Sequence, residues 1–234
     1  MIIEVIGTRL NDVKEAELYG ANRVELCQSM SESGLTPNYG LIKSAVELVD
    51  IPINVMVRPH SDSFVYDEND LKVMNEDIRM IKKLGANGIV IGPLTKEGTI
   101  DEAALKILLE EANGLEVTFH RAFDFVQDQQ VALTTILKYE QITTILTAGG
   151  NGIATEFVSN LVALNDRTKN THLTIMPGNG LRVNELEEFH QEVKPRALHF
   201  GAGVRIGHTF ANGLSEEKLR QVRVKGGMSL PVKR

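Results

Sequence analysis

The segment EVTFHRAFD, residues 116–124, combines a strand-forming run with three side chains that can do chemistry. Its Val-Thr-Phe run favours a buried strand, and His120, Arg121 and Asp124 follow within five residues. Burying an imidazole, a guanidinium and a carboxylate is costly unless they are paired or used. We therefore expect a functional site at this strand end. Asp124 either orients His120 or caps the following segment, and capping is the favoured interpretation.

Glu25 and Arg58 lie at the ends of two other predicted strands. If Glu25 and His120 both point into one cleft, they could form an acid–base pair. Arg58 and Arg121 would then hold the negative charge of a substrate. The alternative is a buried ion-pair network without chemistry, to which Glu4 on the first strand would belong.

Three later strand ends are rich in glycine, a residue that lets the backbone approach a phosphate closely. The candidates for such an anion or phosphate site are Gly178, Gly180, Gly201 and Gly203, with Arg182 as a charged clamp. The alternative is that these glycines only form tight turns between strands and helices.

Cys27 is the single cysteine and shares a strand face with Glu25, because side chains alternate along a strand. A thiol at a strand end could bind a soft metal such as Cu(I), or act as a nucleophile. Met56, Met176 and His120 are possible further ligands from other strands. The alternative is a small buried residue near the rim of the fold.

Strand-like and helix-like patterns alternate along the whole chain, and this pattern predicts an α/β fold. Eight such units favour a (β/α)8 TIM barrel formed by a single domain, residues 1–210, followed by a helix and tail over 211–234. An open doubly wound sheet would need a glycine-rich turn after the first strand, and Gly-Thr-Arg-Leu at 7–10 is not one. The expected strands span residues 2–7, 23–27, 53–58, 88–94, 116–121, 143–148, 172–177 and 197–201. The expected helices span 12–19, 39–49, 68–84, 101–111, 128–138, 153–165, 185–191 and 216–224.

The composition narrows the classes of partner. The 234 residues carry a net charge of -6 without a basic block, so nucleic acid is not expected as a partner. An apolar run of about 18 residues would indicate a membrane span, and the sequence has none. The first residues lack the pattern of a signal peptide. A lone cysteine cannot form an internal disulfide, so the chain fits a reducing cytoplasm.

Several motifs together resemble the CutC-type copper homeostasis proteins over about residues 2–203. These motifs are VELC (24–27), GLTP (34–37), VRP (57–59), VTFHRAFD (117–124), ILT (145–147) and GLR (180–182). The resemblance implies a cytoplasmic TIM barrel, usually oligomeric, with a role in copper handling. It also implies Cys27 as a copper ligand. Phe64-Val65-Tyr66 departs from the family's Phe-Cys-Tyr pattern, so this chain lacks a second thiol that is often present.

Three functions therefore stay open at the sequence level. The first is copper homeostasis with Cu(I) bound through Cys27. The second is an enzyme that uses acid–base chemistry at Glu25 and His120 on a small anionic or phosphorylated metabolite. The third is a structural barrel whose polar interior is only an ion-pair network. In the first two, the partner is a metal or small molecule at the barrel mouth, and a homo-oligomer is expected.

Overall fold

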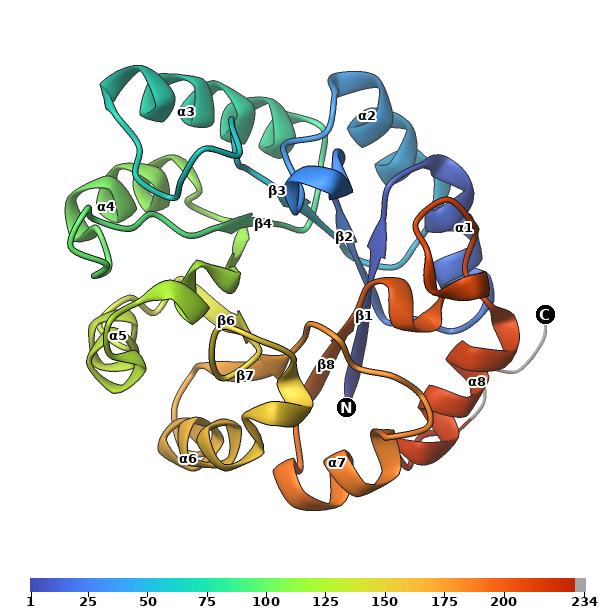
Figure 1. Cartoon of the computed structure of the whole chain (residues 1–234). Helices are drawn as coiled ribbons and strands as arrows, with labels where there is room; N and C mark the ends of the chain where they lie inside the picture. Colours follow the sequence, from blue (N-terminus) through green and yellow to red (C-terminus); the bar gives the residue numbers. More distant parts are fainter. Residues whose placement is uncertain (230–234) are drawn as a thin grey trace.

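Eight parallel strands close into a barrel inside a ring of eight helices, as Figure 1 shows for this computed structural model, which describes residues 1–229. The strands are β1 (Ile2–Gly7), β2 (Arg23–Leu26), β3 (Ile53–Met56), β4 (Gly88–Ile91), β5 (Glu116–Phe119), β6 (Ile142–Thr147), β7 (Thr174–Pro177) and β8 (Ala197–Phe200). The helices are α1 (Leu10–Leu18), α2 (Tyr39–Leu48), α3 (Glu68–Lys83), α4 (Glu102–Glu111), α5 (Gln129–Ile136), α6 (Val158–Thr168), α7 (Leu186–Val193) and α8 (Glu216–Lys225). The predicted single-domain TIM barrel is confirmed.

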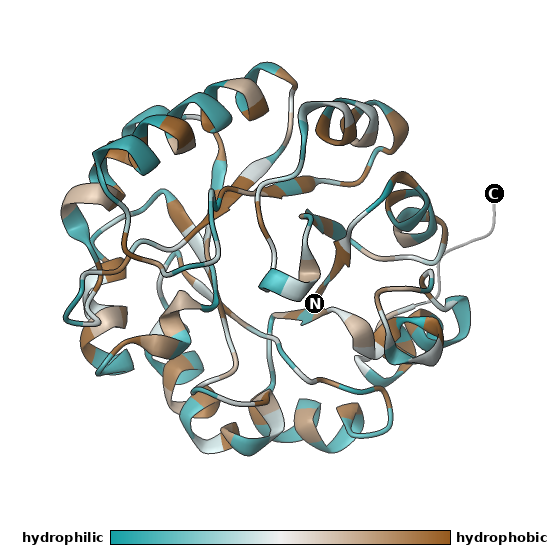
Figure 2. Cartoon of the chain, turned by 45° about the horizontal axis from the view of Figure 1, so that its top comes forward, coloured by the Kyte–Doolittle hydropathy of each residue, from teal (hydrophilic) through white to brown (hydrophobic). Residues whose placement is uncertain are grey.

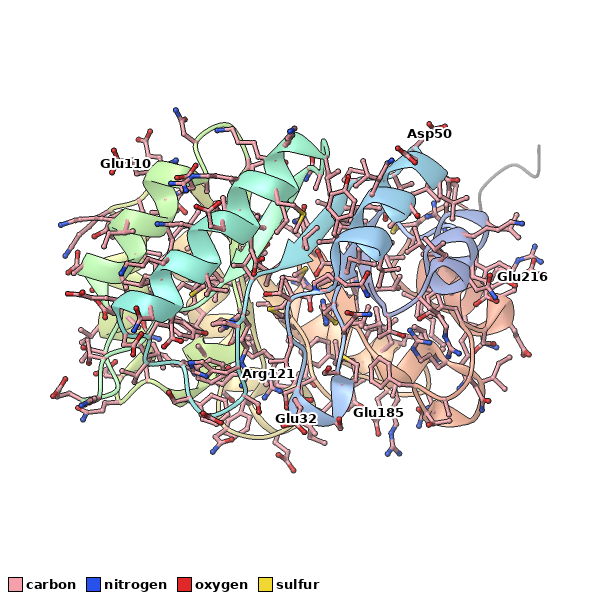
Figure 3. All side chains as sticks on the ribbon, turned by 90° about the horizontal axis from the view of Figure 1, so that it is seen from above. Glu32, Asp50, Glu110, Arg121, Glu185 and Glu216 are labelled. Atoms are coloured by element: carbon pink, nitrogen blue, oxygen red, sulfur yellow. The ribbon has the colours of Figure 1, made fainter. Side chains whose placement is uncertain are left out.

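The strands follow one another around the barrel in chain order. Parallel hydrogen-bonded pairing runs from β8 through β1, β2 and onward to β7, and β7 and β8 lie in contact where the ring closes. The carboxyl ends of all strands therefore meet at one mouth. In Figure 3 this mouth is the lower end, where Glu32, Arg121 and Glu185 project, while Asp50 and Glu110 mark the opposite end.

Side-chain alternation along the strands divides the molecule into two environments. Val5, Val24 and Val55 belong to the main apolar core between the strands and the helices. Their neighbours, such as Glu4 and Asn54, point to the other side and line the barrel interior, where they are fully buried. The functional polar groups therefore lie inside the barrel, and the apolar faces hold the helices on its outside.

The helices present hydrophilic residues outward and apolar residues toward the strands, as the colouring in Figure 2 shows. In α3, Met74, Ile78 and Ile81 are fully buried at helical spacing. A capping box begins this helix: Asp67 accepts from the amide of Asp70, and the Asp70 carboxylate accepts in return from the amide of Asp67. No helix within residues 1–229 is long and apolar enough to cross a membrane.

Several strands end earlier than the sequence pattern predicts. The pattern predicts β3 through Arg58, β4 through Leu94 and β5 through Arg121, but these strands end at Met56, Ile91 and Phe119. After β5 the backbone tightens into a 3-10 turn, η2 (Arg121–Phe125). The expected helix over 153–165 is likewise divided, with a 3-10 turn η3 (Ala154–Glu156) before α6. These turns place the polar side chains in the mouth rather than along the sheet.

The segment that follows β8 is bound to the first helix by a buried ion pair. Arg205 and Asp12 are both 0% exposed, and the Arg205 guanidinium donates to Asp12 at 2.8 and 3.1 Å and to the Ile6 carbonyl at 2.8 Å. Leu219 and Val222 of α8 belong to the main core. The helix predicted over 216–224 is therefore the eighth helix of the barrel wall. Residues 230–234 of the expected tail lie outside the described residues.

We expect Asp12→Ala to destabilise the protein by about 3–5 kcal/mol, because it leaves the buried Arg205 charge unpaired. Urea unfolding followed by circular dichroism measures this change. Glu76→Ala is the control, since it removes an exposed partner of Arg79 in an i,i+3 pair and should cost at most about 1 kcal/mol. Equal effects of the two substitutions would contradict a structural role for the Arg205–Asp12 pair.

Candidate functional site

Three sulfur-containing side chains pack together at the mouth above β2 and β3. Cys27 directly follows β2, Met30 lies on the 3-10 turn η1 (Met30–Glu32), and Met56 ends β3. The Cys27 Sγ lies 3.3 Å from the Met30 Sδ. A Cβ atom built on Gly34 would lie 3.6 Å from the Cys27 Sγ and 3.7 Å from the Met56 Cε, so the loop after β2 covers both side chains. We call Cys27, Met30 and Met56 the sulfur cluster.

Burial determines the chemistry of the Cys27 thiol. The side chain is 0% exposed, and this burial, together with the nearby Glu25 carboxyl, raises the pKa of the thiol well above its usual value. The thiol is therefore protonated at neutral pH, which disfavours the nucleophile interpretation because the thiolate is the reactive form. A metal could still displace the proton.

Two side chains expected as further ligands lie away from Cys27. The Met176 Sδ accepts from Arg23 at 3.6 Å, in a cluster with Leu146 and Ala197. The His120 ring packs against Phe64 with a centroid distance of 5.1 Å. Met30 takes their place, and the spacing C-x-x-M could have indicated it from the sequence.

A buried ionic centre joins three neighbouring strands below the sulfur cluster. The Glu4 carboxylate accepts from the Arg23 Nε at 2.5 Å and lies 2.7 Å from the His199 Nδ1. Burial alone would raise the pKa of Glu4, but Arg23 and His199 outweigh it and lower the value to about 2. Glu4 is therefore ionised at neutral pH. This state agrees with the hypothesis that Glu4 belongs to a buried ion-pair network.

Glu25 lies beside this centre in a different protonation state. Its Oε2 atom is 3.9 Å from the His199 Nδ1 and has no hydrogen-bond partner within residues 1–229. Burial and the negative charge of Glu4 raise the pKa of Glu25 to about 7, against the opposing charges of His199 and Arg23. The pKa of His199 is raised as well: burial lowers it, but Glu25 and Glu4 outweigh that effect. The imidazole beside Glu25 is thus His199, whereas the sequence led us to expect His120.

The carboxylates of Glu4 and Glu25 and the imidazole of His199 offer ligand atoms that all lie within 4.8 Å of one another. This set could hold a hard or borderline metal ion. However, Glu4 is already paired with Arg23, and the guanidinium charge opposes a second cation at this place.

His120 lies over the end of the neighbouring strand β4. A Cβ atom on Gly92 would come within 2.3 Å of the His120 ring, so only glycine leaves room for the imidazole there. The His120 Nδ1 accepts from the Ala122 amide at 3.1 Å and thereby caps the turn η2. Burial and the charge of Arg58, with a smaller effect of Arg121, lower the pKa of His120 to about 3. The ring is therefore neutral at physiological pH.

Asp124 joins the turn η2 to the end of β6. It accepts from the Ala148 amide at 3.0 Å and from the Thr147 hydroxyl, and it pairs with the Arg121 Nε at 2.9 Å. The capping interpretation of Asp124 is wrong, because His120 caps η2 and Asp128 caps α5. Arg121 neutralises Asp124.

Arg58 binds backbone oxygens. Its guanidinium donates to the carbonyls of Glu32 at 2.6 Å, Gly34 at 3.1 Å and Ser61 at 3.2 Å. Its Cζ atom lies 4.9 Å from the centroid of the Phe64 ring. Arg58 therefore connects the loop after β2 to the loop after β3, and it makes no hydrogen bond or ion pair with Glu25.

The glycines after β7 and β8 are explained by close packing of the two loops. A Cβ atom on Gly203 would lie 2.1 Å from the Leu181 carbonyl oxygen. Gly178 donates its amide to Thr147 at 3.0 Å, and Gly180 has a φ of +75°. A Cβ atom on Gly201 would contact Phe210 and Ile6, and Arg182 is exposed. Phosphate binding by these loops stays a prediction.

Comparison with known proteins places this geometry in a family. The family model described as CutC family matches residues 1–204. A family protein CutC from Pasteurella multocida is 37% identical over 207 residues, which cover 88% of this chain and 84% of the relative. The human copper homeostasis protein cutC homolog is 34% identical over 231 residues, covering 98% and 81% of the two chains.

Solved structures agree with this placement. The crystal structure of the putative copper homeostasis protein CutC from Streptococcus agalactiae superposes with a TM-score of 0.80 at 31% identity, covering 86% of this chain and 98% of that one. A phosphoribosyl anthranilate isomerase from Thermococcus kodakaraensis has a TM-score of 0.65 at 15% identity, covering 96% and 97%, and shares the fold. The sequence motifs, the barrel and these relatives lead to one conclusion: the chain belongs to the CutC family.

Proposed function

We propose that this protein binds Cu(I) at the sulfur cluster as part of copper homeostasis. The observation that carries the proposal is the meeting of the Cys27 thiol and the Met30 thioether, 3.3 Å apart, with Met56 beside them. Thiolate and thioether sulfurs are soft ligands that select Cu(I) over hard cations. The description of the human and murine relatives as copper homeostasis protein homologs supports the same role.

The three ligands would play different parts in binding. Cys27 would supply the single negative charge by giving up its proton, and Met56 is held by β3. Met30 is half-buried on a turn flanked by two residues in left-handed conformation, Ser29 with φ 54° and Ser33 with φ 63°. Met30 is therefore the member of the cluster nearest to solvent, and Cu(I) would enter past its thioether.

Cys27→Ser should abolish tight binding of Cu(I), because the two remaining thioethers carry no charge. Met30→Leu keeps the volume but removes a sulfur, and it should weaken binding at least about tenfold, or about 1.4 kcal/mol. Anaerobic competition with a chromogenic Cu(I) chelator measures both affinities. Met176→Leu is the matched control, since this thioether lies with Leu146 and Ala197 instead. Wild-type affinity in Cys27→Ser would refute Cys27 as a ligand.

Cu(I) affinity should rise with pH. The Cys27 pKa is raised well above its usual value, so each bound ion must release one proton over the accessible pH range. The apparent affinity should therefore increase about tenfold per pH unit, one proton per metal ion. The same competition titration at several pH values, corrected for the chelator, gives the slope. A flat profile would show that the thiol keeps its proton, and would contradict thiolate ligation.

A second candidate function rests on the raised pKa of Glu25. A carboxyl group with a pKa of about 7 can both give and take a proton near neutral pH, and His199 lies beside it. We propose as the alternative an enzyme that moves a proton on a small anionic or phosphorylated metabolite. In this alternative Glu25 is the acid–base group, and His199 takes the place expected for His120.

Hydrogen–deuterium exchange tests this alternative. Small phosphorylated and carboxylated metabolites are incubated with the protein in heavy water, and proton NMR detects exchange at carbon. Exchange should occur with wild type and with Cys27→Ser, and should fall at least about a hundredfold in Glu25→Gln, as expected for a lost general acid–base group. Exchange that survives in Glu25→Gln would exclude Glu25 as the proton carrier.

A further inference from the structure

We propose that Arg58, Tyr66 and His120, which we call the donor cluster, bind the oxyanion of a small metabolite, either a carboxylate or a phosphate group. This site lies at the ends of β3 and β5 under the loop 59–66, and it does not depend on the binding of copper at the sulfur cluster.

The first observation is a buried positive charge without a counterion. Arg58 is 5% exposed, yet it takes part in no ion pair within residues 1–229, and its terminal nitrogens donate only to backbone carbonyls. The other strongly buried arginines, Arg23 and Arg205, are paired with Glu4 and Asp12. Buried charges are normally paired because an isolated one is costly. Arg58 therefore favours an anion from outside the chain.

The second observation is a group of buried polar atoms without partners. The Arg58 Nε and the His120 Nε2 find no hydrogen-bond partner in the described part of the chain. The Tyr66 hydroxyl has no partner there of good hydrogen-bond geometry, although it lies close enough to the Arg58 guanidinium to interact with it. Tyr66 is 7% and His120 4% exposed. Folded proteins rarely leave such atoms unsatisfied, and each one costs about 1–3 kcal/mol. Three of them on neighbouring elements indicate that a ligand satisfies them.

All three atoms can donate a hydrogen bond. The Arg58 Nε always carries a proton. The His120 Nδ1 accepts from the Ala122 amide, so the proton of the neutral ring lies on Nε2. The Tyr66 hydroxyl is free to turn its proton toward an acceptor. The partner must therefore be an acceptor, and the charge of Arg58 favours a negative one.

Contacts between the rings bring these donors to one place. The Phe64 ring lies 4.9 Å from the Arg58 Cζ and 5.1 Å from the His120 ring. Tyr66 follows two residues later. Burial raises the pKa of its phenol to about 12, against the charge of Arg58 and a side-chain interaction with the Arg58 guanidinium. Gly92 has no side chain, so the His120 ring can reach across the end of β4 toward β3. Phe64 thus contacts both Arg58 and His120, and Tyr66 interacts with Arg58, so the three donors lie around one aromatic ring.

Two carboxylates near the donor cluster, Asp70 and Asp124, already have partners. Asp70 accepts from the Asp67 amide at 3.0 Å and lies 3.2 Å from the His60 Nε2. Asp124 is bound by Arg121 and by the end of β6. Neither carboxylate makes a hydrogen bond or ion pair with Arg58. The net charge of the donor cluster is therefore positive, which fits an oxyanion and disfavours a cation.

Titration with two probes tests the proposal. Inorganic phosphate and acetate are added separately to the full chain, and isothermal calorimetry measures their affinities. We expect saturable binding of at least one probe. Tyr66→Phe and His120→Asn each remove one donor to a charged acceptor and should weaken that binding about tenfold or more. The preferred probe identifies the group as phosphate or carboxylate.

Two controls separate this site from the others. Thr118 lies on β5, and its buried hydroxyl also has no partner in the described residues. Thr118→Val removes this hydroxyl and should leave the affinity for the probe unchanged. Cys27→Ser should also leave it unchanged, because the sulfur cluster lies elsewhere. If neither probe binds, or if both bind Tyr66→Phe and His120→Asn as tightly as wild type, the proposal is overturned.

A measurement on the wild-type protein tests the proposal independently of the variants, which could fail to fold. Nitrogen-15 NMR should show His120 as the neutral tautomer with its proton on Nε2. The Nε2–H resonance should shift in a saturable manner when the binding probe is added. A proton on Nδ1, or an Nε2–H signal that does not respond to either probe, would overturn the proposal.

Discussion

The ion pair between Glu4 and Arg23 is the interaction on which the electrostatics of the barrel interior depends. It places a permanent negative charge in a region that excludes water, and His199 completes the pairing across β8, β1 and β2. Burial is the main reason that the pKa of Glu25 is raised, and the fixed charge of Glu4 adds to it. Burial lowers the pKa of His199, but Glu25 and Glu4 together outweigh that effect. For the Cys27 thiol, burial and Glu25 are the larger causes of the raised pKa and Glu4 adds a smaller one.

Strand geometry explains why such a charged interior is compatible with a stable fold. Outward residues such as Val5 and Val24 form the apolar core with the helices. Their packing does not involve the inward-facing side chains. The inside of the barrel is thus free to hold groups that would disturb a core. The sulfur cluster sits nearer the mouth, and the ionic centre lies below it.

The periodicity of the sequence was sufficient to predict the eight units and the barrel, and the motifs that resemble the CutC proteins predicted the family. The periodicity predicted the face of each strand residue as well: Glu25 and Cys27 do point inward. Periodicity does not tell which inward residues meet across the barrel. His120 directly follows β5, three strands from β2, whereas His199 reaches Glu25 from β8, because β8 pairs with β1 when the ring closes. The expected Glu25–His120 pair failed for this reason.

The loops were the other part that the sequence could not predict. The path of the loop after β2 brings Met30 to Cys27 and carries the carbonyls that Arg58 binds. Every residue has a backbone carbonyl, so residue types cannot predict which carbonyls Arg58 will bind. Asp124 was misassigned in the same way, because its partners are amides and a hydroxyl at the end of another strand. Motifs identified the chemistry of these side chains but not their partners.

Arg58 serves two parts of the barrel mouth with one side chain. Its guanidinium donates to the carbonyls of Glu32 and Gly34, in the loop that carries Met30, and its Nε belongs to the donor cluster. The position of that loop therefore depends on an arginine that has no carboxylate partner among residues 1–229. Replacing Arg58 would remove the support of the loop and the positive charge of the donor cluster together, so one side chain constrains both parts of the mouth.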